Sequence, residues 1–446
     1  MKKYKKVLVS LLVGAMVFST VACGSSGSDA QQSSGGNDTA QSNTAEEEKQ
    51  TEAAGAEGTG ESVSGDLRMI FWDSNQEPGL VQMAEGFMKQ NPDCKVTVET
   101  VPWDEYWTKL QAAAQGGDLP DVFVMHPDEV KNYAEGGMLM DLTDILNGDI
   151  ANADNFPQYV VDDFKVGGGY YGIPKDIGTL GLFYNKDIFD AAGVEYPTAD
   201  WTWDDMMDAA EKLTDPANGI YGIAADNNGQ NFYWNLIWQN GGEVFDEETQ
   251  LCTFDSPESI EAMEYAVSFV EKGYSPTPAD LANLSADEYF ESGKTAMNFA
   301  GSWMLTEYLN VDTLNFGVAE LPAGKEKGVI CSGMAFSVAA NAKNPEAALK
   351  LVEYLGSEEA QTIEAQSGVA IPAYNGTQQP WIDQFDVDVS AFVTCAAYGH
   401  TSPGFTTSTS AAGSVLDEYM PQVFSLTMPV DEAMKTITEK INESLQ

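Results

Sequence analysis

The stretch LRMIFWDSNQEPGLVQMAEGFMKQNPDCKVTVET, residues 67–100, decides the fold class of this chain. Its apolar run at 67–72 predicts a buried strand, whereas three apolar side chains within 80–87 recur at the spacing of a helix. Residues 95–100 then alternate apolar and polar side chains, which is typical of a second strand. A strand, a helix and a strand in this order favour an α/β fold.

The same alternation of strands and helices continues along the chain. Short apolar runs predict further strands at 122–125 and 180–184. Three helix starts carry capping signals, either a capping box or a cap residue followed by proline. These starts lie at 202–205, 256–257 and 344–345. The helix that starts at 202–205 should run to about residue 213.

The chain is strongly acidic. Its 69 Asp and Glu residues outnumber 22 Lys and Arg residues, for a formal net charge of -47, and Arg68 is the only arginine. Such a surface repels nucleic acid and anionic lipid, and it offers no arginine cluster for phosphate. We therefore expect no nucleic-acid partner and no phosphorylated or polyanionic ligand.

The first 23 residues resemble a bacterial lipoprotein signal. Lysines precede an apolar run at 7–18, which is too short to span a bilayer, and small residues at 19–22 lead to Cys23. Thr20 departs from the leucine that such signals usually carry. The resemblance implies export, lipidation of Cys23 and attachment to the outer face of a membrane. Ordinary secretion with cleavage nearby is the alternative.

Residues 24–64 contain almost nothing that could pack in a core. They consist mainly of Gly, Ser, Ala, Thr, Gln, Asn and Glu, with Val63 as the single large aliphatic side chain. We expect a disordered tether that reaches roughly 35 Å as a flexible coil. The folded part, 65–446, is too long for one compact core, so two domains are expected.

Four further cysteines lie far apart in the sequence and form no C-x-x-C pair. One or two disulfides could form in an exported protein, but buried free thiols are the favoured interpretation. These residues are Cys94, Cys252, Cys331 and Cys395.

No local motif for catalysis or metal binding stands out. The chain has only His126 and His400, and it contains no H-E-x-x-H, G-x-S-x-G or Walker sequence. Residues 167–172 match G-x-G-x-x-G, but Pro174 follows where a helix should begin, so a glycine-rich hairpin is predicted. We expect no metal and no cofactor.

Several tryptophans stand beside turns and small polar residues rather than inside apolar helix faces. A sugar ring offers an apolar face on which aromatic rings stack and a rim of hydroxyls that polar side chains bind. Core packing is the competing interpretation, which we prefer for Trp203. The candidates for sugar contact are Trp72, Trp103, Trp238 and Trp303.

Several blocks of sequence, taken in order, resemble the extracellular sugar-binding lipoproteins of ABC importers, in the maltose-binding-protein-like group. Each block is weak alone, and their order and spacing over about 66–375 carry the resemblance. The blocks lie at 119–122, 133–137, 142–143, 171–174, 182–187, 192–194, 202–205, 297–303, 321–322, 332–334 and 344–345.

The resemblance implies a two-lobed, type II periplasmic-binding-protein-like fold with discontinuous lobes joined by hinge crossings. The first lobe would contain 65–175 plus 335–373, and the second 176–334 plus 374–446. A ligand would bind between the lobes and be trapped by hinge closure.

The resemblance also implies ligand-binding residues. The loop 72–77 resembles a sugar-contacting loop, Asp128 matches an acidic contact, and Trp303 matches a stacking tryptophan. Other candidates lie at the two crossings, while Tyr398, His400 and Phe405 are candidates by position alone. The full set is Trp72, Asn75, Glu77, Trp103, His126, Asp128, Lys175, Asp176, Trp238, Trp303, Gly333, Met334 and Tyr398.

The predicted function is therefore capture of a neutral mono- or oligosaccharide without turnover. The expected partners are that sugar and the permease subunits with their cytoplasmic ATPase, and the protein itself is expected to be a monomer. A secreted glycan-degrading enzyme would need two placed carboxylates, which so acidic a chain could supply. A binder of the same fold for a peptide or a polyamine is the other alternative.

Overall fold

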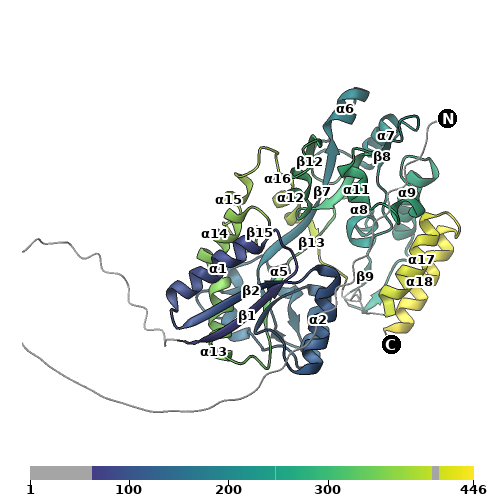
Figure 1. Cartoon of the computed structure of the whole chain (residues 1–446). Helices are drawn as coiled ribbons and strands as arrows, with labels where there is room; N and C mark the ends of the chain where they lie inside the picture. Colours follow the sequence, from purple (N-terminus) through teal and green to yellow (C-terminus); the bar gives the residue numbers. More distant parts are fainter. Residues whose placement is uncertain (1–62, 247, 404–410, 446) are drawn as a thin grey trace, which may run out of the picture. The chain divides into compact units, whose positions relative to one another are not determined.

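The computed structural model describes residues 63–246, 248–403 and 411–445 (Figure 1), all of which belong to one compact unit, Gly60–Gln446. The predicted leader, nearly all of the predicted tether and the candidate Phe405 lie outside the described residues, so the predictions about them stay predictions. Among the described residues, no helix is long and apolar enough to cross a membrane.

The first sheet has five strands in the order β2-β1-β3-β14-β6. The strands predicted at its start are confirmed: β1 runs parallel to both β2 and β3, while β14 runs antiparallel to its neighbours. This sheet and the helices packed on it are called the first lobe. Its strands are β1 (Gly65–Phe71), β2 (Cys94–Thr100), β3 (Val122–Met125), β6 (Ile173–Pro174) and β14 (Ala335–Val338); its helices include α1 (Glu77–Gln90), α2 (Trp103–Gly116), α3 (Pro127–Glu135), α13 (Pro345–Leu355) and α14 (Glu358–Ser367).

The second sheet is built around the ten-residue strand β7 (Asp176–Asn185). Four strands pair with β7 in antiparallel fashion, and two more extend the sheet. This sheet and its helices are called the second lobe. The partners of β7 are β11 (Thr295–Gly301), β12 (Phe316–Ala319), β13 (Val329–Ser332) and β15 (Ile371–Pro372); the outer strands are β8 (Tyr221–Ile223) and β16 (Gly399–His400).

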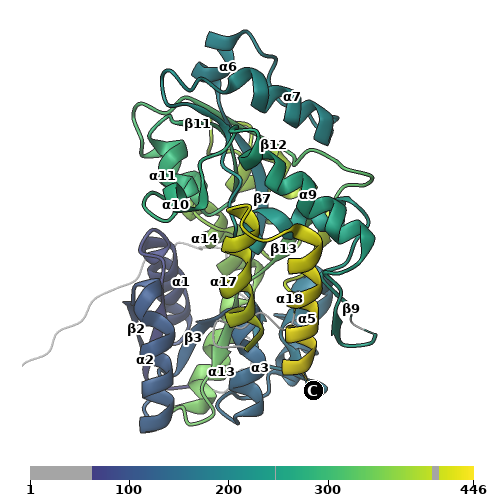
Figure 2. The ribbon, with the colours of Figure 1, turned by 90° about the vertical axis from the view of Figure 1, so that its right-hand side faces the viewer.

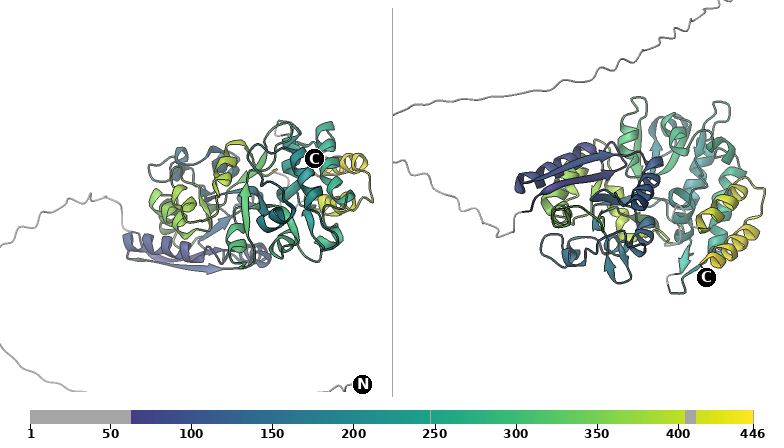
Figure 3. Two further views of the ribbon diagram at one scale, coloured as in Figure 1. Left: turned by 90° about the horizontal axis from the view of Figure 1, so that it is seen from above. Right: turned by 60° about the horizontal axis from the view of Figure 1, so that its bottom comes forward.

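The remaining elements are mostly short, and the two C-terminal helices α17 and α18 run side by side (Figures 2 and 3). They are α4 (Thr143–Leu146), η1 (Ala153–Asn155), α5 (Gln158–Asp163), β4 (Lys165–Val166), β5 (Gly169–Tyr170), α6 (Lys186–Ala192), α7 (Trp203–Leu213), η2 (Gly229–Tyr233), α8 (Trp234–Gln239), β9 (Phe245–Asp246), β10 (Leu251–Cys252), α9 (Pro257–Glu271), α10 (Pro278–Leu281), α11 (Ala286–Glu291), α12 (Met304–Leu309), α15 (Gln379–Ile382), α16 (Ser390–Cys395), η3 (Ala396–Tyr398), α17 (Ala411–Phe424) and α18 (Val430–Ser444).

Local sequence signals explain several of these elements. Thr202 forms the predicted capping box at the start of α7, and Ser256 caps α9. Asn344 precedes α13 as predicted, but its side chain makes no cap and instead donates to the Asp66 carbonyl at 3.0 Å. The predicted glycine-rich hairpin is confirmed, because β4 and β5 pair around Gly167 and Gly168, both with positive φ.

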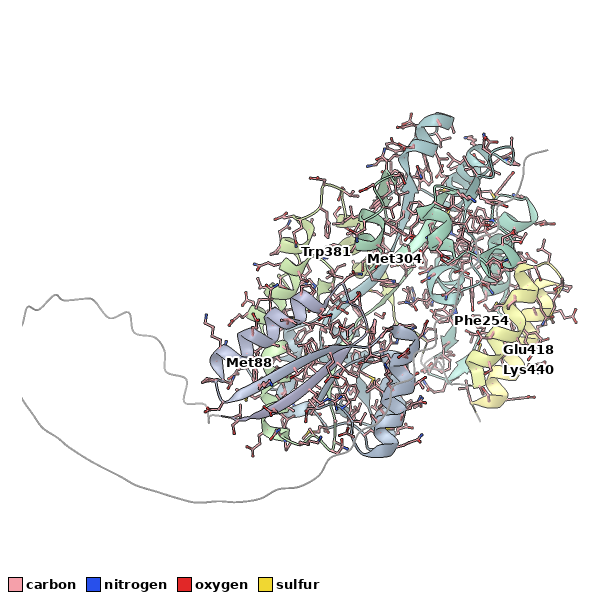
Figure 4. The ribbon with its side chains drawn as sticks, viewed as in Figure 1. Met88, Phe254, Met304, Trp381, Glu418 and Lys440 are labelled. Atoms are coloured by element: carbon pink, nitrogen blue, oxygen red, sulfur yellow. The ribbon has the colours of Figure 1, made fainter. Side chains whose placement is uncertain are left out.

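Two hydrophobic clusters follow the alternation of side chains along β7. Leu180 and Leu182 point into the cluster of the second lobe. Phe183 points to the other side, into a cluster that fills the first lobe and reaches the fully buried Trp381 (Figure 4). The chain therefore packs both faces of its longest strand.

The chain crosses from the first sheet to the second between β6 and β7, and returns between β13 and β14. The crossings lie side by side, because Lys175 N–H donates to the Met334 carbonyl at 2.8 Å. A third connection follows β15, where Ala373 N–H donates to the Lys175 carbonyl at 3.1 Å. Lys175 therefore stands at the centre of all three connections.

Candidate functional site

An aromatic surface lies at the carboxyl ends of β1 and β3. The rings of Trp72 and Trp103 meet edge to face, with centroids 5.1 Å apart, and Trp103 is 47 % exposed. The imidazole of His126 lies 5.9 Å from the Trp103 ring. Trp107, one turn along α2, packs against both tryptophans. Three predicted residues thus share one surface, and Trp107 is an addition that its i+4 spacing from Trp103 could have indicated.

Asp128 and His126 are arranged by the start of α3. His126 is the N-cap residue, and its Nδ1 accepts a hydrogen bond from the Asp128 N–H at 3.2 Å. The Asp128 carboxylate accepts a hydrogen bond from the Ser402 hydroxyl at 2.8 Å. Ser402 belongs to the C-terminal stretch, so Asp128 joins the two lobes in this form.

The loop 72–77 is held by several side chains. Asn75 donates from its backbone to Asp73 at 2.9 Å and from its side chain to Glu307 on α12 at 2.7 Å. Glu77 accepts from the Thr100 hydroxyl at the end of β2 at 2.9 Å. The predicted contacts Asn75 and Glu77 therefore both have protein partners in this form.

The buried Lys175 occupies the first crossing and is 1 % exposed. Its ammonium donates to Gln76 and Asp176, each at 2.7 Å, and to Glu364 on α14. An ammonium has three N–H donors, so all three are used. Burial lowers the pKa of Lys175, but the carboxylates of Asp176 and Glu364 raise it by more, and the net pKa lies above its ordinary value.

The second crossing packs tightly against the first. Met334 N–H donates to the Asp176 carboxylate at 2.9 Å. A Cβ on Gly333 would lie 2.3 Å from the Asp176 carbonyl oxygen and 2.6 Å from Val160, so the crossing needs glycine at this position. The four predicted residues at the crossings are thus brought together, with their polar groups bonded to one another.

Trp303 lies at the start of α12, over the second sheet. A Cβ on Gly301 would meet its ring at 2.3 Å, and one on Gly178 would meet it at 3.4 Å. The indole therefore rests directly on the backbone of β11 and beside that of β7. Its ring remains partly exposed.

Trp238 and Tyr398 lie apart from the aromatic surface. Trp238 is 3 % exposed, and its ring stacks on His400 with centroids 4.7 Å apart. Tyr398 donates to Glu320 at 2.5 Å, and the Lys327 ammonium lies 5.4 Å from its ring. These contacts enclose Trp238 in protein, whereas Tyr398 stays half-buried.

A cavity of about 400 Å³ lies between Asp128 of the first lobe and two segments of the second lobe. Asp226 and Asp417 add carboxylates, and no Lys or Arg is among its described lining residues. Burial raises the pKa of Asp226, and the nearby Asp287 raises it further. The polar and aromatic run 226–234 was missed by sequence reasoning, although its composition resembles that of the other candidates. The lining residues are Asp128, Asp226, Asn227, Asn228, Gly229, Gln230, Tyr233, Trp234, Gly413, Leu416, Asp417, Met420 and Pro421.

The sequence profile of bacterial extracellular solute-binding proteins matches residues 73–362, which is more than half of the chain. The chain belongs to this family. Among solved structures, this solute-binding protein is similar to an ABC substrate-binding protein of Listeria monocytogenes in complex with cycloalternan. The two are 30 % identical with a TM-score of 0.78, over 86 % of this chain and 99 % of the other.

Curated relatives agree with this assignment. The solute-binding protein is 28 % identical to a maltotriose-binding protein of Pyrococcus abyssi, over 59 % of this chain and 55 % of that one. It is 26 % identical to an arabinooligosaccharide-binding protein of Bacillus subtilis, over 66 % and 71 % of the two chains. The predicted family and the type II two-lobed fold are confirmed, and the protein belongs to an extracytoplasmic family of ABC-importer binding proteins, which are not enzymes.

The four cysteines of the described solute-binding protein are free and buried, which confirms the favoured interpretation. Burial raises the pKa of both Cys252 and Cys331 to about 12. Within the described residues, no group of three or more His, Cys, Asp or Glu side chains could hold a metal ion.

Proposed function

We propose that this solute-binding protein captures a neutral mono- or oligosaccharide between its lobes and delivers it to the permease of an ABC importer. The observation that carries the proposal is that each lobe bears tryptophans outside its core and that a carboxylate lines the cavity between the lobes, although Trp72, Trp103 and Trp303 are not among the described lining residues of that cavity. Trp72 and Trp103 lie on the first lobe, Trp303 lies on the second, and Asp128 lines the cavity between the lobes. Aromatic faces suit the apolar side of a sugar ring, and carboxylates accept hydrogen bonds from its hydroxyls.

The charge of the cavity supports a neutral ligand. Asp128, Asp226 and Asp417 line it, and no positively charged described side chain does. An acidic or phosphorylated sugar would be repelled by these carboxylates at short range. The names of the maltotriose and arabinooligosaccharide relatives and the cycloalternan complex favour an oligosaccharide.

The proposed lobes are 65–175 plus 335–373 and 176–334 plus 374–446, and the crossings at Lys175 and Met334 support their limits at 175/176 and 334/335. Strand β15 (Ile371–Pro372), just before the third limit, pairs with β7 of the second sheet. A ligand that contacts both lobes binds the closed arrangement better and so shifts the population toward it. The closed protein, a monomer held to the outer face of the membrane through lipidated Cys23, then meets the two permease subunits and their ATPase.

The test is a thermal-shift and calorimetric panel on the full-length protein in mild detergent. The probes are maltotriose, arabinotriose, cycloalternan, glucose 6-phosphate, a tripeptide and spermidine. Binding at a hundred times Kd stabilises the folded state by about 2.7 kcal/mol. We expect a shift with at least one neutral saccharide, recovered unchanged, and none with the phosphate ester.

Two variants make the panel sharper. Trp103→Ala should weaken sugar binding at least tenfold, whereas Leu445→Ala, which removes a similarly exposed apolar side chain at 42 %, should leave it unchanged. A shift with the peptide or spermidine alone would keep the family and overturn the proposed ligand.

A further inference from the structure

Glu364 is a buried carboxylate far along the chain from the predicted ligand contacts. It lies on the inner face of α14, and its Oε1 accepts a hydrogen bond from Lys175. Its second oxygen, Oε2, is buried and has no hydrogen-bond partner among the described residues. A buried carboxylate with one unsatisfied oxygen lowers the stability of the fold, so its presence calls for an explanation.

The helix that carries Glu364 is a fixed support for the crossings. Gln361, one turn earlier on α14, accepts a hydrogen bond from the Tyr374 N–H at 3.1 Å, just after the third connection. It also donates to the Leu355 carbonyl at 3.2 Å. A Cβ on Gly79 of α1 would lie 2.7 Å from Ser367, so α1 and α14 touch along the same stretch. Glu364 is therefore presented to Lys175 from a rigid element.

Hydrogen bonds connect Lys175 to the loop 72–77. Its ammonium donates to the Gln76 side-chain oxygen at 2.7 Å, and the Gln76 side-chain amide donates to Asp73 at 3.0 Å. Asn75 donates from its backbone to the same Asp73. The loop that carries Trp72 and Asn75 is thus anchored to a buried cation, which is itself held by two carboxylates.

We propose that Glu364 is a positioning residue that acts through Lys175 and Gln76 to hold the loop 72–77 in place. Its ionised carboxylate and that of Asp176 fix the ammonium between them, so that the third N–H points at Gln76. A proton from solvent on Glu364 would neutralise one of these two partners. Lys175 would then be drawn toward Asp176 alone, and the bond to Gln76 would weaken.

The charges around Glu364 make this titration possible near neutral pH. Burial raises the pKa of Glu364 to about 7; Lys175 opposes this effect and Asp176 adds to it. Elements α1, α13, α15 and β15 pack on α14, and among the described residues no charged group from any of them shifts the pKa of this carboxyl. The effect on ligand affinity rests on the proposed function, whereas the effect on the loop does not.

The experiment measures amide hydrogen exchange by mass spectrometry on the full-length protein in detergent at pH 5.5 and pH 8.0, corrected for the intrinsic exchange rate. In the wild type, protection of residues 73–77 should fall at least fivefold at the lower pH. Glu364→Gln mimics the protonated acid, so it should give the low value at both pH values. Glu358→Gln removes an exposed carboxylate from the same helix and should behave as the wild type.

A second variant separates positioning from general loss of structure. Gln76→Leu removes the side-chain oxygen that accepts from Lys175 but keeps the three charged residues Lys175, Asp176 and Glu364. It should lower protection of 73–77 at pH 8.0 while α18 stays protected. Wild-type protection that does not depend on pH would overturn the proposal. The proposal would also be overturned if residues 73–77 kept their wild-type protection at pH 8.0 in Glu364→Gln or in Gln76→Leu.

A binding arm uses maltotriose, arabinotriose and cycloalternan. For any of these that binds, the wild-type Kd should rise at least threefold from pH 8.0 to pH 5.5, and the Glu364→Gln Kd should not change with pH. A wild-type Kd that is equal at both pH values would overturn the coupling. If no sugar binds, the proposed function fails, while the exchange results still decide the role of Glu364.

Discussion

The side-chain amide of Asn75 donates a hydrogen bond to the Glu307 carboxylate at 2.7 Å. Asn75 lies in the loop after β1 in the first lobe, and Glu307 lies on α12 in the second. The bond from Ser402 to Asp128 makes a similar connection at 2.8 Å. Two residues predicted to bind sugar therefore hold the lobes together in this form.

Removal of the first of these bonds should weaken ligand capture. We expect Glu307→Ala to raise Kd for the sugar that binds most tightly about three- to tenfold, because the closed arrangement loses one hydrogen bond worth about 1 kcal/mol. Isothermal titration calorimetry measures the change. Asp312→Ala, an exposed carboxylate just after the same helix, is the control; an equal effect in both variants would contradict the explanation.

Two glycines under Trp303 offer a matched pair. Gly301→Ala places a methyl group 2.3 Å from the indole, so the ring must move, at a cost of roughly 1–3 kcal/mol in folding free energy. Gly178→Ala places it at 3.4 Å, an ordinary contact. We expect at least tenfold weaker sugar binding and altered near-UV circular dichroism for the first variant only. Equal losses of sugar binding in both variants would show that displacement of the Trp303 ring is not the cause.

Glu364 should make folding stability depend on pH. Its pKa rises on folding from an ordinary 4.5 to about 7, so the folded state holds the proton more tightly. Stability from this group is fully present below pH 4.5 and is lost as pH rises toward 7, by roughly 1 kcal/mol per pH unit. His400 acts in the opposite sense, because burial lowers its pKa. The free energy of unfolding in urea is measured at pH 5.0 and 6.5 for the wild type and for Glu364→Gln. The difference between the two proteins gives the contribution of Glu364 at each pH.

Substitution of Lys175 should lower the free energy of unfolding much more than substitution of Glu364. Lys175→Met leaves two buried carboxylates without their partner, and we expect it to lower the free energy of unfolding at pH 7.5 by about 3–5 kcal/mol. Glu364→Gln still leaves Lys175 paired with Asp176, and its loss should be much smaller. Similar losses for the two variants would contradict the arrangement of charges described above.

The four described cysteines should be inert in the native protein. Burial raises their pKa values, to about 11 for Cys395 and about 12 for Cys252 and Cys331, and thiolate is the reactive form. At pH 8, we expect no labelling of these residues by iodoacetamide within an hour, and labelling of all four in guanidinium chloride. Peptide mass spectrometry identifies each site, and rapid native labelling of any of them would refute the prediction.

The predicted anchor can be tested without any ligand. In a bacterial host, Cys23→Ser should move the protein from the detergent phase to the aqueous phase in a phase-separation assay, because the thiol that takes the lipid is absent. Cys94→Ser is the control, since that thiol is buried in the first lobe. A wild-type protein found in the aqueous phase would favour ordinary secretion.

Much of the fold could be predicted because its signals are local. The strands near 67–72 and 122–125 are apolar runs, and α7 and α9 begin at cap residues with side chains of the right length. Strands β15 and β16 have two residues each, so no periodicity marks them. They form only because β7 and β13 provide long-range partners.

Chain order explains best why some of the candidate residues lie close together. Trp72 and His126 follow neighbouring parallel strands, so both lie at one edge of the sheet, where each ring packs against Trp103. Trp238 was harder to interpret, because the imidazole that stacks on it comes from a distant segment. Glu364 gave no signal at all: it is one acidic residue in a polar helix, and its importance comes entirely from the lysine it meets.

The close packing at Gly333 limits how this protein can move. The backbone of one crossing lies against the carbonyl of Asp176 in the other, with no room for even a methyl group, so a larger residue at position 333 would force the two strands apart. We expect the lobes to turn about an axis that runs through these strands. Small changes in angle at the crossings become large displacements at α2 and α11, so spectroscopic labels on those helices would report the opening angle directly.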